Sequence, residues 1–129
     1  MITAPQRVAK SIGEGGCYFL CLCKLAETLG VSIDVLLWYD VAVKEEFMDR
    51  ECFLTSPDLL LSRMSGRKFS VRKESASYVC LPGEYEVLRY EIPRVSGHFV
   101  LPGFDPYGDS HTLAVGQLAS KRIFSEVGV

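Results

Sequence analysis

A cysteine follows a glycine-rich stretch near the start of the chain. Residues 13–16 read GEGG, and Cys17 opens an apolar run that ends at Cys23. If a helix begins at Cys17, the unpaired amides and the positive dipole of its first turn stabilise a thiolate and lower the pKa of the cysteine. The same amides can hold a developing oxyanion. Cys17 is therefore a candidate nucleophile, and a core thiol without a chemical role is the alternative.

A cysteine nucleophile needs a base, and the chain has two histidines. His98 stands at the start of the apolar run GHFV, where its ring can project from a strand end into a cleft. His111 lies in a polar turn and is expected to be solvated. An imidazole base also needs a third group that fixes its tautomer. His98 is the candidate base, and a strand-end residue without a catalytic role is the alternative.

Asp105 lies seven residues after His98, and the Pro102-Gly103 pair between them is typical of a turn. If that turn closes a two-residue hairpin, Val100 opposes Asp105, and His98 lies diagonally from Asp105 on the same face. Diagonal neighbours are roughly 7 Å apart, within reach of these two side chains. Asp105 is therefore a candidate to orient His98, and a residue that serves only the turn is the alternative.

The order Cys, His, Asp, with the cysteine opening a buried helix and the other two on a later sheet, resembles the papain-like cysteine peptidases. The closest resemblance is to small bacterial members such as the bacteriocin-processing peptidase domains of export transporters. In these domains the histidine opens a strand written His-aromatic-Val, and the acidic residue stands in an Asp-Pro pair, as at residues 98–100 and 105–106 here. The segments DPYG (105–108) and SKRIF (120–124) also resemble an uncharacterised group of small prophage- and plasmid-borne proteins.

The resemblance implies a cysteine peptidase or amidase that hydrolyses a peptide or amide bond without a metal or an organic cofactor. In that scheme Cys17 attacks, His98 is the base, Asp105 orients His98, and the Cys17 amide helps to hold the oxyanion. The family usually places a glutamine shortly before the cysteine, at a position that here is Ser11. Gln6, farther upstream, is the glutamine available for the oxyanion site.

Two other functions would use the same residues. A catalytically silent binding module on the same fold would keep the triad as a remnant. An acyl transferase would use the same Cys-His-Asp set to pass the acyl group to an acceptor other than water. The expected partner is a peptide or protein substrate. For an enzyme, we expect the sulfur of Cys17 within ~4 Å of a ring nitrogen of His98.

The two halves of the chain have different periodicities. Apolar patterns predict helices over residues 17–29, 35–48 and 57–66. The first is apolar around most of its girth and therefore buried. The second has a core-facing stripe made of Leu36, Leu37, Trp38, Val41 and Phe47. Alternation predicts strands over residues 68–73, 84–92, 97–101 and 122–124. We expect one domain over residues 1–129 with an α+β, papain-like fold, in which N-terminal helices, the central one beginning at Cys17, pack on a C-terminal antiparallel sheet.

Composition excludes several function classes. The chain has 129 residues, 48% of them hydrophobic, and a net charge of −2, which argues against a nucleic-acid partner. No run reaches the ~18 apolar residues that span a bilayer, and no signal-peptide pattern precedes Cys17, so we expect a cytoplasmic protein without a membrane partner. The five cysteines, three of them in one short stretch, predict free thiols rather than disulfides or a metal site.

Overall fold

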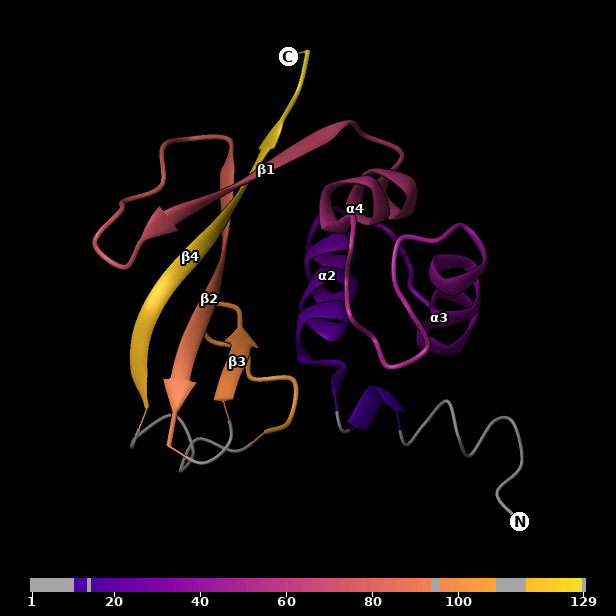
Figure 1. The fold of residues 1–129 in the computed structure, drawn as a ribbon. Helices are drawn as coiled ribbons and strands as arrows, with labels where there is room; N and C mark the ends of the chain where they lie inside the picture. Colours follow the sequence, from indigo (N-terminus) through magenta and orange to yellow (C-terminus); the bar gives the residue numbers. More distant parts are fainter. Residues whose placement is uncertain (1–10, 14, 94–95, 109–115, 129) are drawn as a thin grey trace.

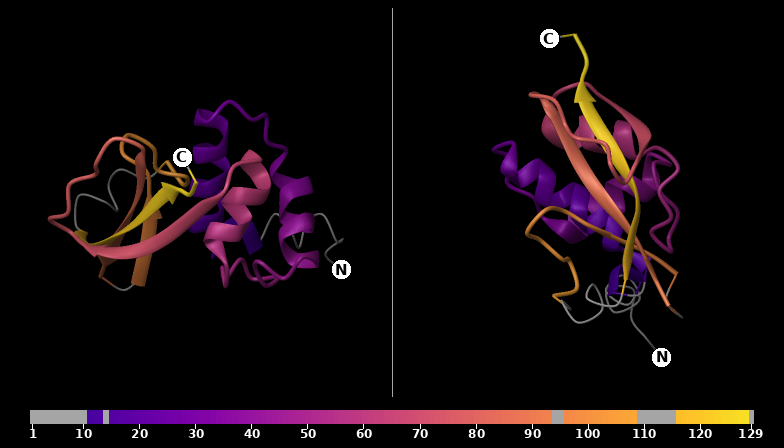
Figure 2. Two further views of the ribbon diagram at one scale, coloured as in Figure 1. Left: turned by 90° about the horizontal axis from the view of Figure 1, so that it is seen from above. Right: turned by 90° about the vertical axis from the view of Figure 1, so that its left-hand side faces the viewer.

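The computed structural model describes residues 11–13, 15–93, 96–108 and 116–128, and its helices and strands form two layers (Figure 1). In chain order the helices are α2 (Cys17–Thr28), α3 (Val35–Lys44) and α4 (Pro57–Ser65). The strands are β1 (Phe69–Ser75), β2 (Glu84–Ile92), β3 (Ser96–Val100) and β4 (Gln117–Glu126). Seen from above, the helices cover one face of the sheet (Figure 2). The predicted α+β fold, with N-terminal helices on a C-terminal antiparallel sheet, is confirmed.

The strands of the described residues form one antiparallel sheet in the order β1-β4-β2-β3. Strand β4 is longer than the predicted 122–124 because it pairs with both β1 and β2, so that backbone hydrogen bonds rather than apolar side chains set its length. Strand β3 lies at the edge of the sheet and contacts α2. One side of the β3 backbone is therefore available to the helical layer.

Helix α2 lies between α3 and the sheet (Figure 1), as expected for a helix that is apolar around most of its girth. Its buried residues are Cys17, Phe19, Cys21, Leu22, Cys23, Leu25 and Ala26. Phe19 and Leu22 belong to the same core cluster as Val87 of β2 and Phe124 of β4. Packing on both sides fixes the position of this helix and of the cysteine at its start.

Helix α3 begins where the sequence predicts, because the Asp34 carboxylate accepts a 3.2 Å hydrogen bond from the N–H of Leu37 and caps the first turn. It ends at Lys44, before the predicted residue 48, since residue 46 has a φ of 62°. Of the predicted core stripe, Trp38 and Phe47 pack against the core, but the prediction is wrong for Leu36 and Leu37, which are more than half exposed. The helix packs through a narrow face instead. The buried residues of that face are Tyr39 and Ala42.

Helix α4 begins with Pro57 at its first turn and is followed by Gly66 with a φ of 71°, both as the sequence predicts. It contacts α2 and leads directly into β1. Among the residues that the structure describes, no helix combines the length and the hydropathy needed to cross a membrane.

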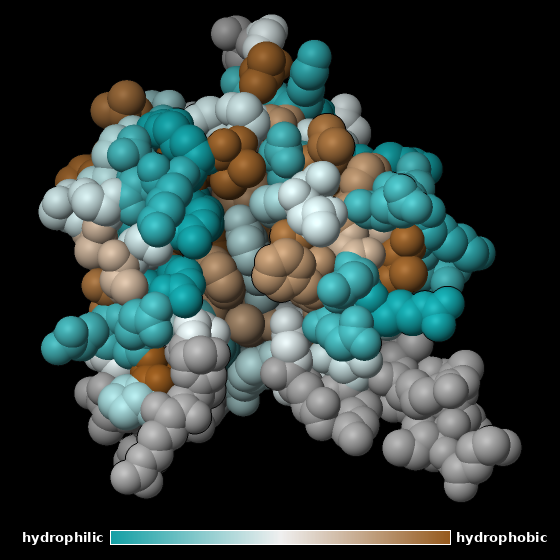
Figure 3. Space-filling view, in the orientation of Figure 1, coloured by the Kyte–Doolittle hydropathy of each residue, from teal (hydrophilic) through white to brown (hydrophobic). Residues whose placement is uncertain are grey.

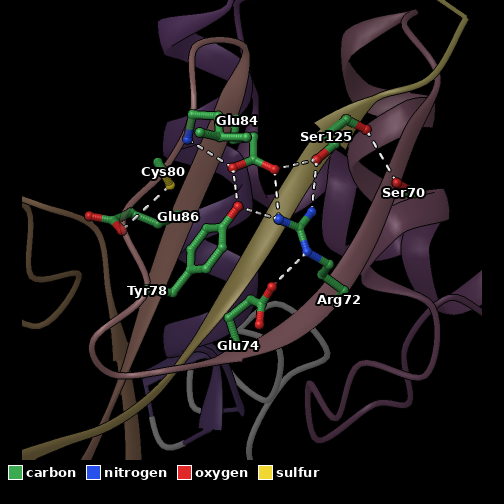
Figure 4. Close-up of polar contacts among 9 residues, drawn as sticks. Ser70, Arg72, Glu74, Tyr78, Cys80, Glu84, Glu86 and Ser125 are labelled. Atoms are coloured by element: carbon green, nitrogen blue, oxygen red, sulfur yellow. Dashed lines mark hydrogen bonds and ion pairs between the residues drawn. The ribbon is translucent and has the colours of Figure 1, made fainter.

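The face of the sheet that turns away from the helices carries a network of charged side chains (Figure 4). The guanidinium of Arg72 in β1 contacts Glu84 at 2.7 Å and Glu74 at 3.0 Å. A second ion pair on this face joins Lys121 of β4 to Glu86 of β2 at 3.0 Å. On this outer face, cations of β1 and β4 are thus paired with carboxylates of β1 and β2.

Candidate active site

Cys17 is the first residue of α2, and its sulfur lies at the edge of the sheet. The N-cap residue Gly16 offers no side chain to the first turn of the helix. Glycine is needed there because a Cβ at position 16 would lie 2.5 Å from the carbonyl oxygen of Ile12. The backbone N–H of Phe99 in β3 donates a 3.5 Å hydrogen bond to Cys17 Sγ. The edge strand thus holds the sulfur next to the residue that follows His98.

Burial is the largest influence on the Cys17 thiol and raises its pKa above the ordinary value of 9.0. The backbone amides of Phe99, Tyr18 and Cys17 lower the pKa, and the negative charge of Asp105 raises it. The expectation that the helix start gives Cys17 a low pKa is therefore wrong, because the removal of the thiolate from water outweighs the amides. Formation of a thiolate here needs a proton acceptor close by.

His98 is buried on β3 and is joined to Asp105. The Pro102-Gly103 turn brings them together, and across it Leu101 and Phe104 exchange backbone hydrogen bonds of 2.9 and 3.0 Å. His98 Nε2 lies 2.9 Å from Asp105 Oδ1, and the two side chains are 7% and 10% exposed. The two-residue hairpin predicted from the sequence is confirmed. An ionised Asp105 accepts from Nε2–H, which leaves Nδ1 as the basic nitrogen of the neutral ring.

Cys17 and His98 line the same cleft. Within the described residues, the His98 imidazole is hydrogen-bonded to Asp105. The Cys17 sulfur accepts a hydrogen bond from the N–H of Phe99 and none from the imidazole. The free lone pair of Nδ1 is the one that can receive the thiol proton. The approach of Cys17 Sγ to within about 4 Å of a His98 ring nitrogen stays a prediction.

Tyr107 is a site residue that the sequence analysis missed. Its ring stacks on the His98 imidazole, with the centroids 5.3 Å apart and the planes inclined by 21°. Its backbone N–H donates a 2.9 Å hydrogen bond to Asp105 Oδ1, the oxygen that also contacts His98. An Asx turn at the Asp-Pro pair is the sequence signal that predicts this backbone contact. The stacking depends on the tertiary structure and has no local signal.

The hydroxyl of Tyr107 lies close to the start of α2. It donates a 3.3 Å hydrogen bond to the carbonyl oxygen of Ile12. Burial, the largest influence, raises the pKa of Tyr107 to about 12, and the backbone amides of Gly16 and Cys17 lower it. The phenol oxygen is therefore within the influence of the Cys17 amide, which is expected to hold an oxyanion.

The site opens into a cleft of about 880 Å³ between the helical layer and the sheet. Figure 3 shows the hollow between the two layers in the orientation of Figure 1. On the side of the α3–α4 connection, the lining includes Phe53, Leu54 and Pro57. Nowhere in the described parts of the chain do three or more His, Cys, Asp or Glu side chains gather so as to hold a metal ion.

The sequence also predicts free thiols and two further candidate residues. All five cysteines are free, as expected, and Cys80 is the one that is not buried. Burial raises the pKa of Cys23 to about 12 and that of Cys52 to about 11. Gln6, predicted for the oxyanion site, and His111, the second histidine, lie outside the described residues.

A family model with the description "Protein of unknown function, DUF261" matches residues 2–126 of the chain, which is nearly its full length. No curated protein and no solved structure gives a match. The resemblance to papain-like peptidases therefore rests on Cys17, His98 and Asp105 and on the short motifs around them.

Proposed function

We propose that this chain, which belongs to the DUF261 family, is a cysteine peptidase or amidase that hydrolyses a peptide or amide bond. The observation that carries the proposal is the 2.9 Å contact between His98 Nε2 and Asp105 Oδ1 in the cleft that also contains Cys17. A buried His-Asp pair that shares a cleft with a thiol at a helix start is an arrangement that supports nucleophilic catalysis by cysteine. The papain-like order of the three residues along the chain supports the same function.

In the first half of the reaction, Cys17 Sγ attacks the carbonyl carbon of the substrate, and the thiol proton passes to Nδ1 of His98. Asp105 stabilises the imidazolium that forms. The C–N bond then breaks, the leaving amine takes the proton from Nδ1, and a thioester remains on Cys17. Water, deprotonated by His98, hydrolyses the thioester and restores the thiol.

The backbone amide of Cys17 and the hydroxyl of Tyr107 hold the oxyanion in this proposal. The hydroxyl turns from the Ile12 carbonyl toward the substrate oxygen as negative charge develops there. Tyr107 thereby takes the place that a glutamine side chain has in the resembled family. Gln6 is the other candidate for the second donor.

The reaction of the chain with p-nitrophenyl acetate, an activated ester, tests the proposal. We expect a burst of p-nitrophenolate equal in amount to the protein, with the acetyl group on Cys17 in peptide mass spectra. Cys17→Ala abolishes the burst. Cys80→Ala keeps it, although Cys80 is the thiol that is not buried. A burst that survives Cys17→Ala, or acetyl groups spread over several cysteines, contradicts the proposal.

The same experiment separates the two alternative functions. An acyl transferase would release the acetyl group to an added amine such as glycinamide and hardly to water. A silent binding module would give no burst. One observation favours hydrolysis over transfer: Tyr107, stacked on the base, keeps 39% of its surface exposed, so that water reaches the site.

A further inference from the structure

The sheet wall of the cleft carries a row of cations that the proposed reaction does not use. Lys73 of β1, Arg89 of β2 and Arg122 of β4, called the cation row below, all line the cleft. Lys73 and Arg122 are direct partners in the β1–β4 register. Two residues away on the same strands, Val71 and Phe124 are also partners and pack in or against the core. Since side chains alternate along a strand, the cation row lies on the face that turns to the helices.

The cation row destabilises the sheet, because the like charges of Lys73 and Arg122 lie directly opposite each other and repel. Within the described residues, no carboxylate pairs with Lys73 or Arg122. On the outer face, by contrast, Arg72 and Lys121 each meet a carboxylate of β2, as Figure 4 shows for Arg72. The sheet therefore compensates its cations on one face and leaves two without a carboxylate in the cleft.

The cation row begins next to the nucleophile. The guanidinium of Arg122 lies over the ring of Phe99, 5.6 Å from its centroid, and the N–H of Phe99 is the group that donates to Cys17 Sγ. Arg89 extends over the edge strand at Gly97, where a Cβ would lie 2.5 Å from the guanidinium. A peptide advances about 3.3 Å per residue, so the residues next to the reacting carbonyl are the ones expected to meet a cation.

The other groups of the cleft favour an acidic peptide as the occupant. Its described lining contains four Lys or Arg residues and one carboxylate, Glu51. Of the four, Arg72 is bound by Glu84 on the outer face, and Arg89 also contacts Glu91. The whole chain has a net charge of −2, so the positive charge of the cleft is local and attracts anions there. The apolar side chains on the helical side suit a peptide better than a nucleic acid.

We propose that the cleft selects peptides that carry an acidic side chain within two residues of the scissile bond, with the cation row as the binding site for that side chain. The scissile bond in this statement rests on the proposed peptidase function. The preference for an acidic peptide does not, because binding can be measured without catalysis.

Fluorescence anisotropy with fluorescein-labelled hexaglutamate tests the preference, on a full-length chain that carries Cys17→Ala. We expect hexaglutamate to bind at least about tenfold more tightly than labelled hexalysine at low salt. Replacement of Lys73 and Arg122 together by Gln weakens hexaglutamate binding by about tenfold, the sum of two modest charge contacts. Lys121→Gln removes one positive charge from the opposite face of β4 and leaves hexaglutamate binding unchanged. Urea unfolding of each variant confirms that it is folded.

Three results would overturn the preference: equal binding of hexaglutamate and hexalysine, full binding by the Lys73→Gln, Arg122→Gln chain, or tight binding of a labelled oligothymidylate without binding of hexaglutamate. The last result would make the cation row a phosphate site. Failure of the peptidase proposal has a different signature, since the acetylation burst at Cys17 would be absent while hexaglutamate still bound through the cation row.

Discussion

The residues around Cys17, the proposed nucleophile, lower the acidity of its thiol more than they raise it. Burial raises the pKa of the Cys17 thiol, and the nearby Asp105 raises it further, while three backbone amides act in the opposite direction. Burial therefore favours the protonated form of the resting thiol. Reactivity must come from proton transfer to His98, whose ring is held by a carboxylate and stacked on Tyr107.

Asp105→Asn tests the role of the carboxylate. The amide oxygen can still accept from Tyr107 N–H, but the negative charge that stabilises the imidazolium is lost. We expect the rate of the p-nitrophenolate burst to fall by about 10²-fold at pH 7, measured by stopped-flow absorbance. Asp40→Asn, on the exposed side of α3, serves as the control with the same chemical change. A loss smaller than about twofold at Asp105 would show that His98 does not depend on it.

Tyr107→Phe separates the hydroxyl from the ring. Phenylalanine keeps the stack on His98 and loses the group that we place beside the oxyanion. Acylation by p-nitrophenyl acetate, which passes through an oxyanion, should slow by about 10²-fold. Alkylation of Cys17 by iodoacetamide, which forms no oxyanion, should keep its rate. Equal losses in both reactions would mean that Tyr107 positions His98 and donates nothing to the oxyanion.

Among the helices and strands, two junctions position the groups of the proposed catalytic site. The start of α2 sets the sulfur, and the hairpin that follows β3 sets the His98–Asp105 pair. The sulfur is tied to β3 through the N–H of Phe99, so that a shift of α2 against the sheet edge would separate the two parts of the site. Both junctions depend on glycine, at position 16 before α2 and at position 103 in the turn, where φ is 74°.

Gly16→Ala tests the first junction. Its new Cβ would meet the backbone of Ile12 at 2.5 Å, which the structure can relieve only by moving the turn. We expect a loss of about 1–3 kcal/mol in the free energy of unfolding, measured with urea, and a slower burst at Cys17. Gly13→Ala is the matched control, because a Cβ there meets nothing within 4 Å. Equal stabilities of the two variants would contradict the close packing of this turn.

The outer face of the sheet predicts a pH dependence of stability. Hydrogen bonds from Tyr78, from the N–H of Leu81 and from Arg72 lower the pKa of Glu84 to about 2, against an ordinary value of 4.5 (Figure 4). A carboxyl with a lowered pKa stabilises the fold above its ordinary pKa, and this contribution disappears as the pH falls through the folded value. The contribution of Glu84 should therefore be complete above about pH 4.5 and lost toward about pH 2.

Glu84→Gln measures that contribution. The parent chain should have the higher urea midpoint at pH 7, and the difference between parent and variant should shrink between pH 4.5 and pH 2. Glu45→Gln on the helical side, where the ion pair with Arg63 is exposed, should show little of this trend. A difference that stays constant down to pH 2 would show that the Glu84 carboxylate is not stabilised by its partners.

In the whole molecule, features set by residues close in the sequence were predicted correctly more often than features that depend on tertiary packing. Three features have a clear signal in the local sequence, and the structure has each as predicted. They are the apolar girth of α2, Pro57 at the start of α4 and the Pro102-Gly103 turn. The same turn explains why the contact between His98 and Asp105 could be anticipated from spacing alone. Each of these features is determined by residues that lie close together in the sequence.

Other features depend on how the two layers meet, and the sequence does not encode them locally. Leu36 and Leu37 fit a core stripe by periodicity, but α3 has one narrow buried face. The Tyr107 stack and the cation row arise from packing and from the β1–β4 register. The raised pKa of Cys17 follows from burial, which a helix-start argument omits.

Alkylation by iodoacetamide tests whether Cys17 and His98 form a reactive pair. The rate is followed for each cysteine by mass spectrometry from about pH 5 to about pH 10. In the parent chain, Cys17 should react at least about tenfold faster at pH 7 than the less buried Cys80, and its rate should fall in mild acid. In His98→Ala, Cys17 should be slow at pH 7 and react faster only in alkali, because its proton acceptor is lost while burial still raises its pKa above 9.0. Equal rates for Cys17 in the two chains at pH 7 would contradict a Cys17–His98 pair, and with it the peptidase proposal.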